Sequence, residues 1–591
     1  MMRLFRRQAS TPLALSPEGR SLHGSLRRKP PPQLRPYPIQ MTQGRRVVIA
    51  LLAAAAVGAA RTAAAAPAQV GARGTAHPMW VTASGTPCTN TLKSDCEYRS
   101  CKEEELHTGN SCGPNGTTKC RVFYYCDCRG PGAAPGCTSG SDANSGLSPS
   151  SPRRNLSTAA AQFARLNRGD TIAFCRGGSF SGGTTYWQDK TFSASNPVII
   201  RDYTGASWQT GSEPRPKMPG PFKFSSVTGV RALNFDVNNA GSDSETATSS
   251  DVTACNWHIH DGNLGFYVVG RGSENTRIKL VGSRITNISN MGWIGSGQFI
   301  EVRDNYFNNA SGFSTAAHTM YWGGSVLSNG GVVSGNEIHP PAGATGAQMN
   351  LHGIHLNLLV ENNQLIYDNA ATYVASAYGL CLQPGYGGQG LGEKYDHAIV
   401  RGNLVVNAGG NAIVTRGCIA CLVENNVVVQ TNGTMVNGII SPDMATSLPD
   451  TSPSTYSTVR NNTVYLSAGG TGIMTGVQGS GYYVANNVVY SPSGTCFNWQ
   501  GSAGAYTERD YNFCWGHTEA PVGPHSRNDV DPRWVNAPSD LRPAPGSPLI
   551  GASDPNTTCT VQDATDQRCS ASIDMLGATR PAAASSGAFE P

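Results

Sequence analysis

The chain has 591 residues, of which only 14% are charged and 69 are glycine. This length exceeds one small domain, and low charge with abundant glycine argues against a helical cytosolic protein. Residues 1–66 hold eleven basic residues and one acidic residue, so the net charge of +5 hides a remainder with 33 basic and 38 acidic residues. An acidic remainder disfavours non-specific binding to nucleic acid, and we expect no nucleic-acid partner.

The first predicted element is a secretion leader over residues 1–66. Arg45 and Arg46 precede the apolar run VVIALLAAAAVGAA, which ends in small residues at 64–66. This order is typical of a signal peptide, and the run is too short to span a bilayer comfortably. Met41 is a plausible true start. We therefore expect a secreted or periplasmic protein with no membrane association once the leader is cleaved.

The next segment, residues 67–137, is predicted to be stapled by disulfides. The chain has 17 cysteines, which fits an oxidising compartment, and eight of them fall between positions 88 and 137. A rival interpretation is zinc, for which two cysteine pairs each offer half a site: Cys126 with Cys128 and Cys418 with Cys421. Two other pairs are spaced for local disulfides: Cys496 with Cys514 and Cys559 with Cys569. The odd total leaves at least one cysteine outside any intrachain disulfide.

A short helix and a strand come next. Ser157 or Thr158 could cap the helix AAAQFARL, and the apolar strand TIAFC follows at 171–175. Beyond this point, short apolar runs alternate with glycine and asparagine for more than 250 residues.

Asparagine recurs before short β-branched runs, and this recurrence is a repeat. Successive anchors are separated by 31, 27, 40, 23, 36 and 25 residues: Asn305, Asn336, Asn363, Asn403, Asn426, Asn462 and Asn487. One structural unit every 20–30 residues is the signature of a solenoid, and the long intervals indicate loop insertions. Asparagine suits the tight corner before a strand, and stacked asparagine side chains can hydrogen-bond along the solenoid.

With these repeats, residues 138–591 resemble the right-handed parallel β-helix of the pectate-lyase-like superfamily. The stretch SDANSGLSPSSP…LNRGDTIAFCRGGSF is similar to the opening of secreted bacterial members, and DPRWVN…GSPLIGAS…IDMLGATRP…GAFEP is similar to their C-terminal trailer. The resemblance implies an all-β fold with a short N-terminal capping helix, a β-helix over 138–535 and a trailer over 536–591 that packs on it. This fold hosts lyases, hydrolases, epimerases, esterases and non-catalytic spike proteins.

Five strands align internally: HTMYW (318–322), HGIHL (352–356), YGLCL (378–382), NAIVT (411–415) and NGIIS (437–441). Because side chains alternate along a strand, one column of this alignment points inward. It contains Met320, Ile354, Leu380, Ile413 and Ile439. The next column points outward and contains Tyr321, His355, Cys381, Val414 and Ile440. The column at the strand entry contains His318, His352, Tyr378, Asn411 and Asn437.

The alignment predicts a catalytic patch of His318, Tyr321, His352 and His355 on an outer face. Histidine titrates near neutrality and serves as acid, base or ligand. Further groups extend the patch as predicted substrate-binding residues: Tyr267, Trp293, Tyr378 and Arg416. The alternative is that these histidines are corner residues bonded to backbone and that the aromatic rings pack under loops.

A metal alternative exists in the HIHD motif, where His258 and His260 with Asp261 would suit a divalent ion. Alternation of two histidines in a strand is also ordinary outward geometry.

Three functions remain open. The first is a lyase that cleaves a uronate-containing polysaccharide by β-elimination, which needs a base, an acid and a neutraliser of the carboxylate. His355 or His352 would be the base and Tyr321 the acid. Arg416, His318 or a bound Ca²⁺ would be the neutraliser.

The second function is a glycoside hydrolase, which needs two carboxylates flanking one bond. Its candidates are Asp261, Asp304, Glu337, Glu361 and Asp443. The third is a non-catalytic carbohydrate-binding or surface protein. The lyase is favoured because histidine and tyrosine, not paired acids, fill the aligned columns. We expect a monomer whose substrate is an acidic polysaccharide.

Overall fold

The computed structural model describes residues 76–81, 87–89, 96–98, 101, 120–270, 275–312, 314, 317–323, 327–367, 376–383, 392–443, 454–476, 479–516, 522–556 and 571–591. The chain divides into two units, residues 1–64 and 65–591, and every described residue belongs to the second unit. The predicted leader and the predicted Cys559–Cys569 pair lie outside the described residues.

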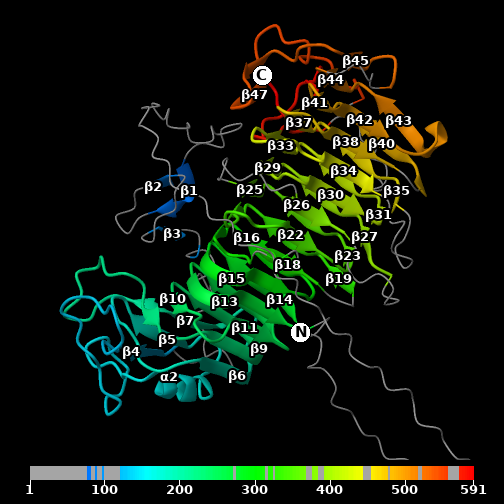
Figure 1. The fold of residues 1–591 in the computed structure, drawn as a ribbon. Coiled ribbons are helices and arrows are strands. Elements are labelled where there is room, and N and C mark those ends of the chain that lie inside the picture. The colour runs from blue at the N-terminus through cyan, green and yellow to red at the C-terminus, as the bar shows by residue number, and fades with distance from the viewer. Residues whose placement is uncertain are drawn as a thin grey trace, which may run out of the picture. The chain divides into compact units, whose positions relative to one another are not determined.

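The second unit is a parallel β-helix, which confirms the predicted fold class (Figure 1). Each coil runs through faces that we call I, IV, II and III, in chain order. Among the described residues, face IV occurs only between residues 327 and 480. Three strands are long enough to turn from one face to the next: β9 (Phe222–Leu233), β13 (His258–Val269) and β15 (Arg284–Gly295). Because consecutive coils pair in parallel register, equivalent residues of each coil stack in columns along the solenoid.

Face I consists of β6 (Thr185–Thr191), the first half of β9 (Phe222–Leu233), β11 (Ser244–Ala247), the second halves of β13 (His258–Val269) and β15 (Arg284–Gly295), β18 (Met320–Trp322), β22 (Gly346–Leu351), β26 (Ala377–Leu382), β30 (Asn411–Arg416), β34 (Asn437–Asp443), β38 (Thr471–Thr475) and β42 (Thr495–Trp499). Face IV consists of β19 (Leu327–Asn329), β23 (Ile354–Leu356), β27 (Lys394–Asp396), β31 (Cys418–Ile419), β35 (Ser454–Thr455) and β39 (Gly479–Ser480).

Face II consists of β4 (Val122–Tyr125), β5 (Thr171–Cys175), β7 (Val198–Tyr203), the second half of β9, β12 (Ser250–Cys255), β14 (Thr276–Val281), β16 (Glu301–Arg303), β20 (Val332–Ser334), β24 (Leu359–Glu361), β28 (Ile399–Arg401), β32 (Leu422–Glu424), β36 (Thr458–Arg460), β40 (Tyr482–Ala485) and β43 (Tyr506–Asp510). Face III consists of β8 (Lys217–Met218), β10 (Asp236–Asn238), the first halves of β13 and β15, β17 (Tyr306–Asn308), β21 (Glu337–His339), β25 (Gln364–Ile366), β29 (Leu404–Val406), β33 (Val427–Gln430), β37 (Thr463–Leu466), β41 (Val488–Tyr490), β44 (Phe513–Trp515) and β45 (Arg527–Asn528).

A ladder of buried asparagines forms the corner between faces II and III. Each side-chain amide donates to the Oδ1 atom of the next coil's asparagine at 2.9–3.0 Å, along Asn305, Asn336, Asn363, Asn403, Asn426, Asn462, Asn487 and Asn512. The predicted stacking of the seven anchors is confirmed, and Asn512 is an eighth member. Each Oδ1 also accepts a backbone N–H, so the corner leaves few buried polar atoms without partners.

The residue before each ladder asparagine has a left-handed backbone, with φ between 51° and 63° for Asp304, Gly335, Asn362, Gly402, Asn425, Asn461, Asn486 and Tyr511. The double asparagines of the sequence therefore divide two tasks. The first residue makes the turn, which asparagine and glycine tolerate better than most residues, and the second residue joins the ladder.

The β-helix begins earlier than predicted. β4 pairs in parallel with β5, so the first coil includes residues before the expected boundary at 138. The predicted capping helix is present as α2 (Leu156–Phe163), which packs Phe163 against Trp187 of the first coils. It begins one residue before Ser157, and Asn155 holds the N-cap position, so the predicted cap residues lie inside the helix.

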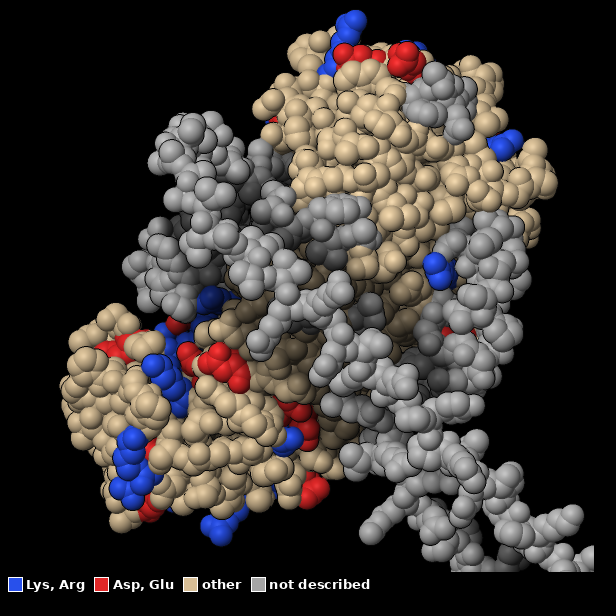
Figure 2. All heavy atoms as spheres, viewed as in Figure 1, with Lys and Arg blue, Asp and Glu red and all other residues tan. Residues whose placement is uncertain are grey.

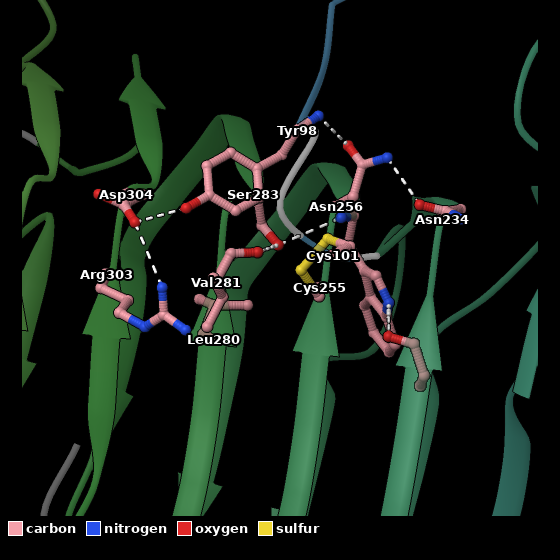
Figure 3. The surroundings of a disulfide bond; sticks show 12 residues. Tyr98, Cys101, Asn234, Cys255, Asn256, Leu280, Val281, Ser283, Arg303 and Asp304 are labelled. Atoms are coloured by element: carbon pink, nitrogen blue, oxygen red, sulfur yellow. Dashed lines mark hydrogen bonds and ion pairs between the residues drawn. A yellow bond between two sulfur atoms is a disulfide. The ribbon is translucent and has the colours of Figure 1, made fainter. Parts of the chain in front are cut away.

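The N-terminal segment is fastened to the II–III corner of the early coils. It contains the antiparallel strands β1 (Ala76–Val81), β2 (Pro87–Thr89) and β3 (Glu97–Tyr98). Cys101 forms a disulfide with Cys255 at the end of β12, and the Tyr98 hydroxyl donates to Asp304 Oδ2 at 2.6 Å (Figure 3). The Tyr98 backbone N–H donates to Asn256 Oδ1 at 2.9 Å.

The cysteines of both predicted zinc half-sites are in disulfides and are therefore not available to bind zinc. The cysteines concerned form the pairs Cys126–Cys175, Cys128–Cys137 and Cys418–Cys421. The sulfurs of Cys126, Cys128 and Cys137 lie close together, but all three are already in disulfides. The predicted Cys496–Cys514 disulfide is confirmed. Cys381 is buried and lies outside these disulfides.

The C-terminal residues cover face III of the later coils. Leu541, Met575, Ala588 and Phe589 pack against Leu404, Val406, Val427 and Val429, and β46 (Trp534–Asn536) pairs with β47 (Asp540–Pro543). A short 3₁₀ helix, η1 (Ala503–Ala505), precedes β43. Within the described residues, no helix has both the length and the apolar character to cross a bilayer.

Candidate functional site

The outer column of face I is the one that the sequence predicted, except in one coil. Tyr267, Ile294, Tyr321, Asn350, Cys381 and Val414 are successive register partners. The predicted register of the strands at 318–322, 378–382, 411–415 and 437–441 is therefore confirmed. The predicted register of residues 352–356 is wrong, because Met349 and Asn350 of β22 occupy the positions assigned to Ile354 and His355.

The error arises at a turn inside the motif HGIHL. Gly353 has φ of 114°, and it separates β22 on face I from β23 on face IV. His352 therefore directly follows β22, whereas His355 lies on β23, which faces a different direction. Both strands are short, so apolar alternation alone could not locate the turn between them.

His355 points into the core and not outward. Its side chain lies between Ser328 and Tyr395 in the face IV stack, and the residue is 1% exposed. The ring stacks on Tyr395 with centroids 5.5 Å apart, and Nε2 lies 2.7 Å from the carbonyl oxygen of His352. Burial lowers the pKa of His355 to about 4. Its contacts are those of a packed core side chain, which argues against the predicted role as a base.

Trp293 is also a core residue. It pairs with Phe266 and Met320 in an inward column, is 1% exposed and contacts the ring of Trp322. The expectation that Trp293 extends an outer aromatic patch is wrong, because the outward neighbour of Tyr267 is Ile294. Tyr267 itself is half-buried on the outer column, as predicted.

Four residues meet on the outer side of face I, and we call them the face I cluster: His318, Tyr321, Asn350 and His352. The rings of His318 and Tyr321 stack with centroids 5.2 Å apart, and the His352 ring meets Tyr321 edge-on at 5.3 Å. The amide of Asn350 lies 3.3 Å from His318 Nε2. Three of the four predicted catalytic residues are therefore brought together, and Asn350 stands where His355 was expected.

The protonation of the two imidazoles follows from their backbone contacts. Nδ1 of His318 lies 2.5 Å from the Ala347 carbonyl oxygen, and Nδ1 of His352 contacts the Gln383 carbonyl oxygen. A carbonyl only accepts, so each Nδ1 carries a proton and each Nε2 is the basic nitrogen. Burial lowers the pKa of His318, and burial with two neighbouring histidines lowers the pKa of His352 to about 4. Both rings are therefore neutral at pH 7.

Asn350 was missed by the sequence analysis. Its Oδ1 atom is buried and has no hydrogen-bond partner among the described residues. A buried acceptor without a partner is costly, and a hydrogen-bond donor of a bound ligand would satisfy the Asn350 oxygen. The signal was the run AQMN, whose Met349 and Asn350 align with Met320 and Tyr321.

Arg416 ends its strand at a position equivalent to His352. Leu351, Leu382 and Thr415 are register partners, and they are followed by His352, Gln383 and Arg416. Two steps of about 4.8 Å separate His352 from Arg416 along the face. Tyr378 is half-buried in the column of Ala347, beside the apolar outer residues of the later coils.

The hydrolase candidates are engaged elsewhere. Asp304 pairs with Tyr98 and Arg303, Glu337 with His339, Glu361 with Arg401, and Asp261 with His260. The side chain of Asp443 lies outside the described residues. Among described residues, no three carboxylates lie close enough together to suggest an all-acidic Ca²⁺ site. Calcium remains a prediction.

Comparison with solved structures gave distant matches. The pectate lyase Pel9A has a TM-score of 0.36 at 14% identity, over 82% of this chain and all of that one. A family 6 polysaccharide lyase, Pedsa3628 from Pseudopedobacter saltans, has a TM-score of 0.39 at 12% identity, over 64% and 98%. XylC in complex with xylose has a TM-score of 0.40 at 10% identity, over 76% and 97%.

No protein-family model matches the chain, and the search of curated proteins also gave no match. At these identities and TM-scores, the activities of the three solved proteins say nothing about the activity of this chain.

Proposed function

We propose that the protein is a secreted polysaccharide-active enzyme that cleaves a uronate-containing polysaccharide by β-elimination. The observation that carries the proposal is the meeting of Tyr321 with two neutral histidines and Asn350 on one outer face. β-Elimination needs a base for the proton beside the carboxyl group, an acid for the leaving oxygen, and a group that stabilises charge on the carboxyl group.

The geometry supports a role for each residue. His352 is the base, because its Nε2 carries the lone pair and its Nδ1 is held by a backbone carbonyl. Tyr321, in ring contact with both histidines, is the acid. The second N–H of the Asn350 amide would donate to the uronate carboxyl group, and its Oδ1 would accept from a sugar hydroxyl. Arg416 lies further along the same face to bind the carboxylate of a neighbouring sugar. Tyr267 and Tyr378 provide aromatic surface for sugar rings.

The experiment is an incubation of the protein with alginate, pectate, hyaluronan, chondroitin and heparan-type polymers, with and without Ca²⁺. New ultraviolet absorbance from an unsaturated uronate would report elimination, and a reducing-end assay would report any cleavage. We expect absorbance with one or more polymers, reduced about 10²–10⁴-fold in His352→Ala because general base catalysis contributes on that scale.

Three outcomes would contradict the proposal or its site. Reducing ends without absorbance would indicate a hydrolase and redirect attention to the carboxylates. No product in either assay, with bound polymer in a pull-down, would indicate a non-catalytic binding protein. A His352→Ala variant with full elimination activity would remove this cluster as the active site.

A further inference from the structure

A second cluster lies on face III of the early coils, away from the face I cluster. Asp236 of β10 and His258 and His260 of β13 place their ligand atoms within 4.8 Å of one another. Asp236 and His258 are register partners on adjacent coils, and His260 is the next outward residue on the same strand as His258. The three side chains are 28%, 16% and 19% exposed, so an ion from solvent can reach them.

The atoms that face one another are those that bind metals. Nε2 of His260 lies 2.8 Å from Asp236 Oδ1, and Nδ1 of His258 lies 3.5 Å from Asp236 Oδ2. In a tetrahedral site with bonds of 2.0–2.2 Å, neighbouring ligand atoms are about 3.3–3.5 Å apart. The contact at 3.5 Å is already in this range, and the contact at 2.8 Å needs only a small displacement.

The opposite nitrogen of each ring is held by another group. Nδ1 of His260 lies 2.7 Å from Asp261 Oδ2, and Nε2 of His258 lies 3.0 Å from Thr286 Oγ1. Metal-binding histidines characteristically bond their second nitrogen to a carboxylate, carbonyl or similar group, which fixes the ring and its tautomer. Asp261 also contacts Asn287, so the outer carboxylate is itself oriented.

We propose that Asp236, His258 and His260 form a binding site for a divalent first-row transition metal ion such as Zn²⁺. Two imidazoles and one carboxylate favour such an ion over Ca²⁺, which prefers six or more oxygen ligands. Three protein ligands leave at least one coordination position for water or an oxygen of a ligand. Arg284 is the register partner of His258 on the following coil, and its positive charge lies near the His258 ring.

The structure also changes the reading of the motif HIHD. The sequence grouped both histidines with Asp261, but Asp261 lies behind His260 and the third ligand, Asp236, comes from the preceding coil. The site therefore depends on the stacking of two coils and would not form in an unfolded segment. This proposal is independent of the proposed lyase activity.

The test is a titration of the untagged, chelator-treated full chain with Zn²⁺ by calorimetry and with Co²⁺ by visible absorbance. We expect one bound ion per chain. Binding should weaken at least 100-fold in His258→Ala and in His260→Ala, and about 10–100-fold in Asp261→Asn, whose effect acts through His260.

The matched control is His339→Ala, because His339 lies on the same face and pairs with Glu337 outside the cluster. The His339→Ala variant should bind the metal ion as tightly as the unaltered protein. Circular dichroism shows whether each variant is folded. Asp261 is exposed, so Asp261→Asn should weaken metal binding without affecting the fold. Absence of stoichiometric binding in the unaltered protein, or binding that survives the His258→Ala and His260→Ala double change, would overturn the proposal.

Discussion

The outer side of face III differs between the two halves of the β-helix. In the early coils it carries Asp236, His258, His260, Arg284, Thr286 and Glu337, and in the later coils it carries Leu404, Val406, Val427 and Val429. The inward residues are apolar in both halves. In the view of Figure 2, charged side chains gather on the N-terminal coils, whereas the C-terminal coils show few.

The two halves are also held differently. The N-terminal segment is fixed to the early coils by a disulfide and polar contacts, whereas the C-terminal residues bury an apolar surface of the later coils. The same strand framework therefore supports two kinds of outer surface. An outward apolar column indicates that another segment covers it, and an outward polar column is available for ligands.

The largest expected effect is at the covered half. Phe589→Ala removes a ring that is 1% exposed and packs with Val427 and Leu404, so we expect a loss of about 3–5 kcal/mol in the free energy of unfolding. Asn308→Ala, on the exposed surface of the early half, should change it by less than about 0.5 kcal/mol. Chemical denaturation measures both. Equal effects would contradict the distinction between the halves.

The next effect is a loss of folding stability at low pH, caused by His355 in the middle coils, where the two halves meet. The pKa of His355 is about 4 in the fold, below its ordinary value of 6.5, so the folded state favours the neutral ring. The stabilisation is complete above about pH 6.5 and is lost as the pH falls toward 4, by about 3 kcal/mol.

Replacing His355 with phenylalanine keeps a ring against Tyr395 and removes the titrating group. We expect a flatter dependence of stability on pH between 6.5 and 4 than in the unaltered protein, measured by denaturation at several pH values. An unchanged slope would show that His355 does not titrate as its burial requires.

A comparable loss of stability is expected when the disulfide between the N-terminal segment and the early coils is removed. Replacing Cys101 and Cys255 with alanine opens a loop with a sequence separation of 154 residues, and loss of such a link costs about 2–4 kcal/mol. Limited proteolysis should then release the N-terminal segment while the later coils stay resistant. If the segment stays protected, the polar contacts of Tyr98 suffice to hold it.

The last comparison concerns two ion pairs of face II, and it includes the smallest expected effect, that of Arg401→Met. Arg401 pairs with Glu361 at the surface, and Arg460 pairs with Glu424 in a buried setting. Arg401→Met should cost less than about 1 kcal/mol, whereas Arg460→Met leaves a buried carboxylate without its cation and should cost about 3–5 kcal/mol. Thermal unfolding of the two variants measures both losses of stability. A larger loss in Arg401→Met than in Arg460→Met would contradict the burial of the Arg460–Glu424 pair.

Much of the fold was predictable because one physical constraint repeats. The corner between faces II and III needs a left-handed residue followed by a stacking amide, and the sequence marks it with NN, DN or GN in coil after coil. The turn between faces I and IV has no such requirement, so Gly353 could not be distinguished from the glycines within strands. That ambiguity placed His355 outside when it lies in the core.

The site was predictable to the extent that it depends on register within face I. Tyr321 and His318 were found because their strand was assigned correctly. His352 was expected at the start of its strand but lies directly after the end of β22, and Asn350 was missed because β22 was assigned to the wrong residues. Asp236 could not be linked to the HIHD motif from spacing, since the intervening residues include a loop of a length that no periodicity fixes.

The most direct test of the proposed lyase uses two tyrosines of the same outer column. Tyr321 lies in the face I cluster, whereas Tyr186 lies on the outer side of β6 and is 55% exposed. On a polymer that yields ultraviolet absorbance, Tyr321→Phe should lower kcat at least 100-fold, and Tyr186→Phe should leave it unchanged. Equal activity of the two variants would contradict the assignment of Tyr321 as the acid and of face I as the catalytic surface.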